Sequence, residues 1–106
     1  PQEPGYECAL TGTCPGSITL SWSGETPNKQ QGVLFAADVG QFVIPGGVCR
    51  GTPLGLSSER FRVLSFIGTR SGSGSVQGTA RPSACGGYIQ LVEKPSCLTS
   101  NVAGPI

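Results

Sequence analysis

The chain has 106 residues, enough for one domain with a two-layer core, and its five cysteines occur without a histidine. Its seven basic and six acidic residues are scattered and give a net charge of +1, which excludes the basic footprint of a nucleic-acid-binding protein. No apolar run approaches the roughly 18 residues of a membrane span, and disulfides persist in oxidising compartments. We therefore expect a soluble protein that is secreted or exposed at a cell surface.

The chain begins with a stretch that contains two prolines and shows no periodicity. We expect residues 1–13 to form an extended arm that needs an anchor elsewhere. The first clear strand follows at residues 17–23, where Ile18, Leu20 and Trp22 alternate with small hydroxyl residues. Because Trp22 continues this apolar stripe, we interpret it as a core residue in preference to a sugar-stacking platform.

Three further segments lead to the middle of the chain. Residues 32–38 form a continuous apolar run, as expected of a strand buried on both faces. A short strand is predicted at residues 41–44, before Pro45. The glycine-rich segment after it predicts a crossing between sheets, with a short edge strand around Leu54 and Leu56.

Two strands are predicted between residues 60 and 80. Alternation over residues 60–67 places Phe61, Val63 and Ile67 on one face and Leu64 and Phe66 on the other. After the glycine- and serine-rich turn at 70–74, a weaker strand is predicted at 75–80.

The last predicted core strand lies between Cys85 and Cys97. Tyr88, Gln90 and Val92 are expected on one face, and Ile89, Leu91 and Glu93 on the other. Pro95 ends this strand, because proline has no backbone N–H to donate.

These segments make about seven short strands separated by turn signals, with no segment of helical period. The pattern predicts an all-β, disulfide-stabilised, antiparallel two-sheet sandwich of immunoglobulin-like or fibronectin-like type; a small β-barrel is the alternative. We expect an N-terminal arm at residues 1–13, the sandwich at 14–97 and an extended C-terminal tail at 98–106.

Several short motifs are spread over this frame: SWSG at 21–24, TPN at 26–28, FVIP at 42–45, CRGT at 49–52, LGL at 54–56, ACG at 84–86 and CLTSNV at 97–102. Together they resemble a β-rich module of secreted bacterial proteins, especially of planctomycete-like and myxobacterial-like lineages, that often forms the C-terminal end of large surface proteins. The resemblance covers about residues 14–102. It implies a surface location and no enzymatic role. The chain departs from the module in its N-terminal arm and in Cys8.

An odd number of cysteines leaves at least one thiol unpaired or paired between chains. Bracketing of the last strand favours disulfides that join Cys49 to Cys85 and Cys14 to Cys97. Cys8 is then the unpaired residue, a candidate either for an interchain bridge or for a buried inert thiol. A pairing of Cys8 with Cys14 is the competing assignment.

Catalysis is not expected, because the absence of histidine removes the Ser-His-Asp and Cys-His arrangements. No spacing brings two carboxylates together for glycoside hydrolysis, and we interpret four of them as solvated: Glu25, Asp38, Glu59 and Glu93. No metal, nucleotide or other cofactor motif is recognised.

Two functions remain. The first is a structural subunit of an extracellular fibre or surface layer, in which copies of the chain exchange a strand or tail. Leu98, Val102 and Ile106 make the tail the apolar candidate for that exchange, and the proline-containing arm at 1–7 is the other candidate. The second is a monomeric accessory module that binds a glycan or a surface through an exposed aromatic row of Trp22, Tyr88 or Tyr6. A bound or O-linked glycan is the remaining partner considered.

Overall fold

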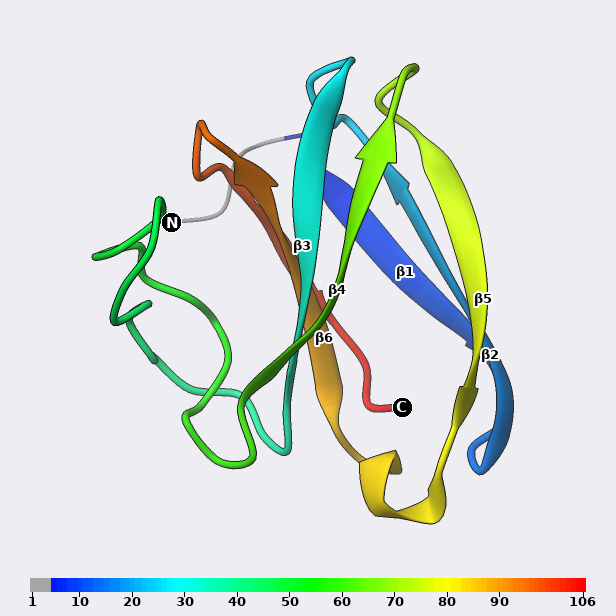
Figure 1. Cartoon of the computed structure of the whole chain (residues 1–106). Helices are drawn as coiled ribbons and strands as arrows, with labels where there is room; N and C mark the ends of the chain where they lie inside the picture. Colours follow the sequence, from blue (N-terminus) through cyan, green and yellow to red (C-terminus); the bar gives the residue numbers. More distant parts are fainter. Residues whose placement is uncertain (1–4) are drawn as a thin grey trace.

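A computed structural model describes residues 5–106 and consists of seven β-strands and one short 3-10 turn. The strands are β1 (Glu7–Gly12), β2 (Gly16–Ser23), β3 (Lys29–Ala36), β4 (Arg62–Thr69), β5 (Gly74–Ala80), β6 (Tyr88–Lys94) and β7 (Thr99–Ala103), and the 3-10 turn is Pro82–Ala84. Figure 1 shows the strands arranged as two facing sheets. The predicted all-β sandwich is confirmed.

One sheet has the order β1-β2-β5 and the other the order β4-β3-β6-β7, and every pairing is antiparallel. Each sheet keeps two edge strands within residues 5–106, so the barrel alternative is wrong for this part of the chain. The arrangement is a fibronectin-like sandwich with two disulfides.

The first core lies between the sheets, as strand alternation requires. In the larger sheet, Val33 pairs with Leu91 and Phe35 with Ile89, so these four side chains share its inner face. They face buried residues of the smaller sheet, Cys8, Leu20 and Trp22, and Tyr6, which directly precedes β1. Trp22 is only 6% exposed, which confirms its interpretation as a core residue.

A second core covers the outer face of the larger sheet. The crossing segment at residues 37–61 lays Cys49, Leu54 and Leu56 against Leu34 and Val92 of the sheet. Gln90 joins the segment to the sheet, because its Oε1 accepts a hydrogen bond from the Gly55 N–H at 2.9 Å and its Nε2 donates to the Ser100 carbonyl at 2.9 Å. The faces predicted for the last core strand are therefore correct.

The number of strands agrees with the prediction, but two of their positions do not. The expected strands at 41–44 and around Leu54 and Leu56 are reduced to isolated bridges, Val39 with Leu56 and Val43 with Pro53, within the crossing segment. Their places are taken by β1 and β7, which lie in the regions predicted as arm and tail. The expected boundaries are corrected accordingly: residues 7–12 and 99–103 belong to the sandwich, because both pair along their length with a neighbouring strand.

Candidate functional site

The two lateral sides of the sandwich differ. On one side, β1 and β7 are joined by the side chain of Asn101. Its Oδ1 accepts a hydrogen bond from the Cys8 backbone N–H at 2.7 Å, and its Nδ2 donates to the Cys8 carbonyl at 3.0 Å. This amide satisfies two backbone groups at the edge of β1, so this side is closed to a further strand at Cys8.

The opposite side is open. Its edges are β4 and β5, which are linked by the turn at residues 70–73 and diverge from there, as Figure 1 shows. A cleft of about 680 Å³ lies between the sheets along these edges. Its floor consists of core residues from both sheets, among them Leu20, Val33, Phe35 and Ile89.

A β-bulge in β4 decides which side chains face the cleft. Val33 pairs with Ser65 and Leu34 with Val63, so Leu64 is an extra residue without a partner on β3. Leu64 lines the cleft, whereas Val63 lies opposite Leu34 and Phe66 opposite Gly32, on the outer face. The predicted faces are correct for Phe61, Val63 and Leu64. They are wrong for Phe66 and Ile67, because the bulge shifts the faces by one residue.

Three apolar side chains of β4 remain about half exposed: Val63 at 48%, Leu64 at 50% and Phe66 at 48%. Phe66 is partly covered by the Lys94 ammonium, whose Nζ lies 4.3 Å from the ring centroid. Large exposed apolar groups on an unpaired edge strand are unusual in a soluble monomer, because such an edge can pair with another chain.

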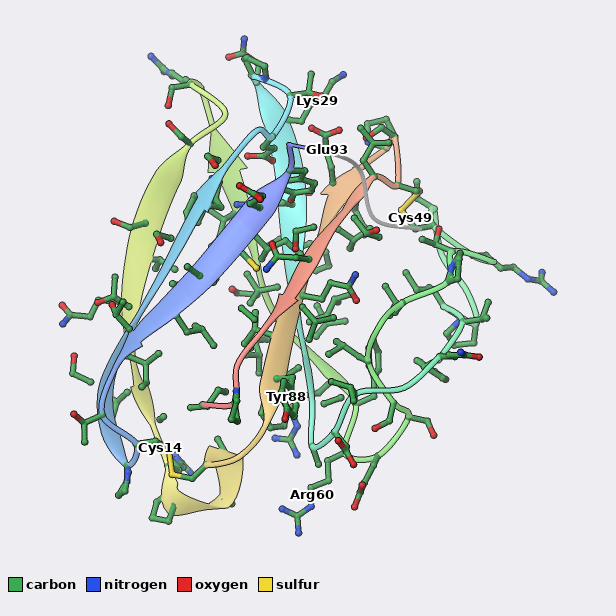
Figure 2. All side chains as sticks on the ribbon, turned by 180° about the vertical axis from the view of Figure 1, so that it is seen from behind. Cys14, Lys29, Cys49, Arg60, Tyr88 and Glu93 are labelled. Atoms are coloured by element: carbon green, nitrogen blue, oxygen red, sulfur yellow. A yellow bond between two sulfur atoms is a disulfide. The ribbon has the colours of Figure 1, made fainter. Side chains whose placement is uncertain are left out.

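Arginines gather at one end of the cleft. Arg60, Arg62 and Arg81 line it where β4 begins and β5 ends, and Arg60 Nη1 donates to the Ser83 carbonyl at 3.4 Å. Figure 2 shows Arg60 at the end of the molecule that also carries Cys14, away from Lys29 and Glu93. Among the described residues, no aspartate or glutamate lines the cleft.

A buried polar cluster lies elsewhere and corrects the interpretation of two carboxylates. Glu93 is fully buried and accepts hydrogen bonds from the Thr26 N–H at 2.5 Å, from Thr26 Oγ1 at 3.1 Å and from Ser96 Oγ. Glu25 is also buried, at 4% exposure, so neither of these two is solvated, in contrast to Asp38 and Glu59, which are exposed. The alternation along this strand predicts Glu93 on the inner face, and this is the signal from which its burial could have been inferred.

The hydroxyl of Tyr6 belongs to the same cluster and donates to Gln31 Oε1 at 2.5 Å. Burial and, secondarily, the nearby Glu25 and Glu93 raise the pKa of Tyr6 far above its ordinary value of 10.0. The cluster fixes the strand ends by hydrogen bonds, and Tyr6, Gln31 and Glu93 are at most 1% exposed. A structural role therefore accounts for it.

The disulfides use the four predicted cysteines in a different pairing. Cys14 bonds to Cys85, with Cα atoms 5.6 Å apart, and Cys49 bonds to Cys97, with Cα atoms 5.4 Å apart. The predicted pairs are wrong because the β1–β2 turn meets the segment between β5 and β6, while the crossing segment meets the β6–β7 turn. Figure 2 shows Cys14 and Cys49 at opposite ends of the molecule.

Cys8 is unpaired, as predicted, and the alternative pairing with Cys14 is wrong. Its side chain is 6% exposed and its Sγ lies 3.5 Å from Ser100 Oγ. Burial raises the pKa of the Cys8 thiol. In this structure the residue is a buried thiol, since its inward position in β1 leaves no path to a cysteine of another chain.

The apolar residues of the predicted tail contact their own chain. Leu98 and Ile106 pack against the first core, and Val102 packs against the second. Ile106 also exchanges backbone hydrogen bonds with the residues before β6: its carbonyl accepts from the Gly86 N–H and its N–H donates to the Gly87 carbonyl, both at 2.8 Å. All three are half-buried.

Within residues 5–106, no group of three or more histidine, cysteine, aspartate or glutamate side chains is arranged to hold a metal ion. The same residues contain no helix long and apolar enough to cross a membrane. No protein-family model matches the chain, and no curated protein matches its sequence. Two features of the described residues offer a surface to another molecule: the edge strand β4 and the cleft beside it.

Proposed function

We propose that this domain is a structural subunit of an extracellular fibre or surface layer and that copies of it join through strand β4. The single observation that carries the proposal is an unpaired edge strand with three half-exposed apolar side chains. An edge of this kind offers backbone donors and acceptors to a second chain, and its apolar side chains lose water on contact.

The proposed contact is an antiparallel pairing of β4 with β4 of a second copy. Natural edge strands are usually protected by charges, prolines or bulges. In β4 the only charge is Arg62 at its start, and the bulge at Leu64 affects only the first half. The regular part from Ser65 to Thr69 is therefore the segment that pairs, with Phe66 on its outer face.

Exchange of the tail, the other route considered for assembly, is less favoured by the geometry. Removing β7 from its own sheet breaks its pairing with β6 and the Asn101 bridge to β1. The disulfide of Cys97 also fixes the residue that leads into β7. Of the arm, residues 1–4 lie outside the described residues.

Pairing through β4 alone closes after two copies, because a two-fold contact uses the same surface on both partners. Growth into a fibre or layer needs a second contact. The crossing segment offers one, since Val39, Val43 and Val48 are 52%, 48% and 65% exposed. Joining β4 pairs through this second apolar surface gives an open assembly.

An extracellular location agrees with two disulfides, since such bonds persist outside the reducing cytosol, and with the surface location implied by the resemblance. The charged fraction of 12% suits a surface covered by other copies. The glycan-binding alternative needs an exposed aromatic row. Trp22, Tyr6 and Tyr88 do not form one, because Trp22 and Tyr6 are buried and Tyr88 is half-buried. An O-linked glycan stays a prediction.

The test compares sedimentation velocity and negative-stain images of the native protein with those of three variants. Phe66→Glu places a charge on the pairing segment, Val48→Glu places one on the second contact, and Ser75→Glu is the matched control on the exposed part of β5. We expect monomers for Phe66→Glu, because like charges across a strand pair are unfavourable and because the second contact, which has only isolated bridges and no strand edge, is the weaker of the two. We expect pairs for Val48→Glu, which keeps the β4 contact, and native assemblies for Ser75→Glu.

Phe66 is half exposed, so Phe66→Glu should fold. A thermal unfolding curve checks this. The proposal fails if the native protein is monomeric at its highest attainable concentration, or if Phe66→Glu assembles as the native protein does.

A further inference from the structure

The cleft between β4 and β5 has an apolar lining and positive charge at one end. Neither feature takes part in the proposed assembly through the outer face of β4. Most of its lining is apolar: Leu10, Ile18, Leu20, Val33, Leu64 and Val76 contribute side chains. Leu64 and Val76 stand at its mouth and are 50% and 43% exposed. An open cavity of about 680 Å³ with such walls has the dimensions of a small-molecule site.

The cleft carries positive charge at one end only. Arg62 lies at the start of β4 and Arg81 directly follows β5, so both stand at the end away from the 70–73 turn, with Arg60 beside them. No carboxylate of residues 5–106 lines the cleft to neutralise these guanidinium groups. Guanidinium groups favour carboxylates, with which they form charge-assisted hydrogen bonds.

We propose that this cleft binds an amphiphilic monocarboxylate of the fatty-acid class. The carboxylate lies at the end that holds Arg62 and Arg81, and the aliphatic chain runs along the floor toward Val76. From Val76 to Ala80 the strand advances by four residues, or about 13 Å, which sets the length of chain that the apolar part can cover.

Other classes of ligand use the cleft less completely. A neutral apolar molecule leaves the arginines without a partner, a cationic amphiphile is repelled by them, and a sugar leaves the apolar floor uncovered. A peptide strand needs a regular edge, and the bulge at Leu64 interrupts the part of β4 that borders the cleft. The inference does not rest on the proposed assembly, which uses the outer face at Phe66.

The experiment measures binding of decanoate by isothermal titration calorimetry, below the concentration at which decanoate forms micelles. Decyltrimethylammonium carries the same chain with the opposite charge, and hexanoate carries the same headgroup on a shorter chain. We expect saturable binding of decanoate with one site, weaker binding of hexanoate because less apolar surface is buried, and no saturable binding of decyltrimethylammonium.

Variants assign the binding to the cleft. The double variant Arg62→Gln/Arg81→Gln removes two exposed charges, and we expect about tenfold weaker binding of decanoate, since each exposed ion pair contributes modestly. Arg50→Gln removes an exposed charge from the crossing segment and should leave the affinity unchanged within twofold. Leu64→Gln should weaken decanoate binding and leave the native fold intact, because Leu64 is half exposed.

The inference is overturned if decanoate shows no saturable binding, if decyltrimethylammonium binds equally well, or if the double variant binds as Arg50→Gln does. Amide shifts on decanoate addition give an independent readout: they should be largest in β4 and β5 and near residue 81. Shifts confined to the crossing segment contradict the site. Sedimentation of the same samples separates this result from assembly, because a monomeric protein that binds decanoate refutes only the proposed function.

Discussion

The two hydrogen bonds between the Asn101 side chain and the Cys8 backbone, the Asn101 bridge, allow a quantitative prediction of how firmly β1 is held in place. Asn101→Leu keeps the approximate size of the side chain but removes both hydrogen bonds to the backbone of Cys8, which are 2.7 and 3.0 Å long. Each backbone group left without a partner costs about 1–3 kcal/mol when water cannot replace the bond. Two such groups sum to about 2–6 kcal/mol, and because these bonds are only partly buried at the edge of β1, we expect β1 to detach about 2–4 kcal/mol more easily.

The free thiol reports this opening directly. Of the five cysteines, four form disulfides and Cys8 is buried, so a thiol reagent reacts only after β1 moves away from β7. Labelling then follows the population of the open state, and a change of 2–4 kcal/mol raises the rate about 30- to 700-fold. Stopped-flow or manual labelling with a disulfide reagent, together with urea unfolding, measures both quantities.

Two controls accompany this measurement. Asn101→Asp keeps an acceptor for the Cys8 N–H and loses the donor to the Cys8 carbonyl, so its labelling rate should be intermediate. Gln30→Leu makes a similar change at an exposed position of β3 and should alter stability by less than about 0.5 kcal/mol. A labelling rate of Asn101→Leu within threefold of the native rate refutes the role of the bridge.

Three further predictions concern stability. The native state retains the Tyr6 proton above the ordinary pKa of 10.0, whereas the unfolded chain loses it there. The free energy of unfolding should therefore fall by about 1.4 kcal/mol per pH unit above pH 10. Urea titrations at several pH values test this, and an equal slope in Tyr6→Phe contradicts it. Cys14→Ser/Cys85→Ser opens a link between residues separated by 71 positions and should cost about 4 kcal/mol in urea unfolding, with a loss below 1 kcal/mol as the contrary result. Glu93→Gln replaces one buried acceptor oxygen by a donor and should lower the melting temperature through a loss of about 1–3 kcal/mol; an unchanged melting temperature argues against the hydrogen bonds to Thr26.

The strands with strong apolar alternation could be predicted from the sequence. Ile18, Leu20 and Trp22, and likewise Ile89 and Leu91, identify inward faces because a period of two separates the two sides of a sheet. In contrast, β7 has the sequence TSNVA, and its place in the sheet depends on pairing with β6 and on the Asn101 amide. The contact of Asn101 with Cys8 joins residues 93 positions apart, and the polar sequence of β7 has no apolar alternation, so neither leaves a local pattern.

The cleft could not be predicted from the sequence either. A single extra residue, Leu64, changes the faces along β4, and no local signal distinguishes a bulge from continued alternation in an apolar strand. Arg62 and Arg81 line the same cleft because β4 and β5 are edge strands of two facing sheets, an arrangement that no local pattern predicts. The cysteine pairing was likewise open, because four cysteines allow three connectivities and only the topology selects among them.

Sedimentation velocity of the native protein beside Phe66→Glu over a wide range of concentration tests assembly through β4 most directly. We predict that the sedimentation coefficient of the native protein rises with concentration, and that Phe66→Glu, with an unchanged unfolding curve, remains a monomer throughout. A native protein that stays monomeric, or a folded Phe66→Glu variant that associates to the same extent, contradicts this role of the edge strand.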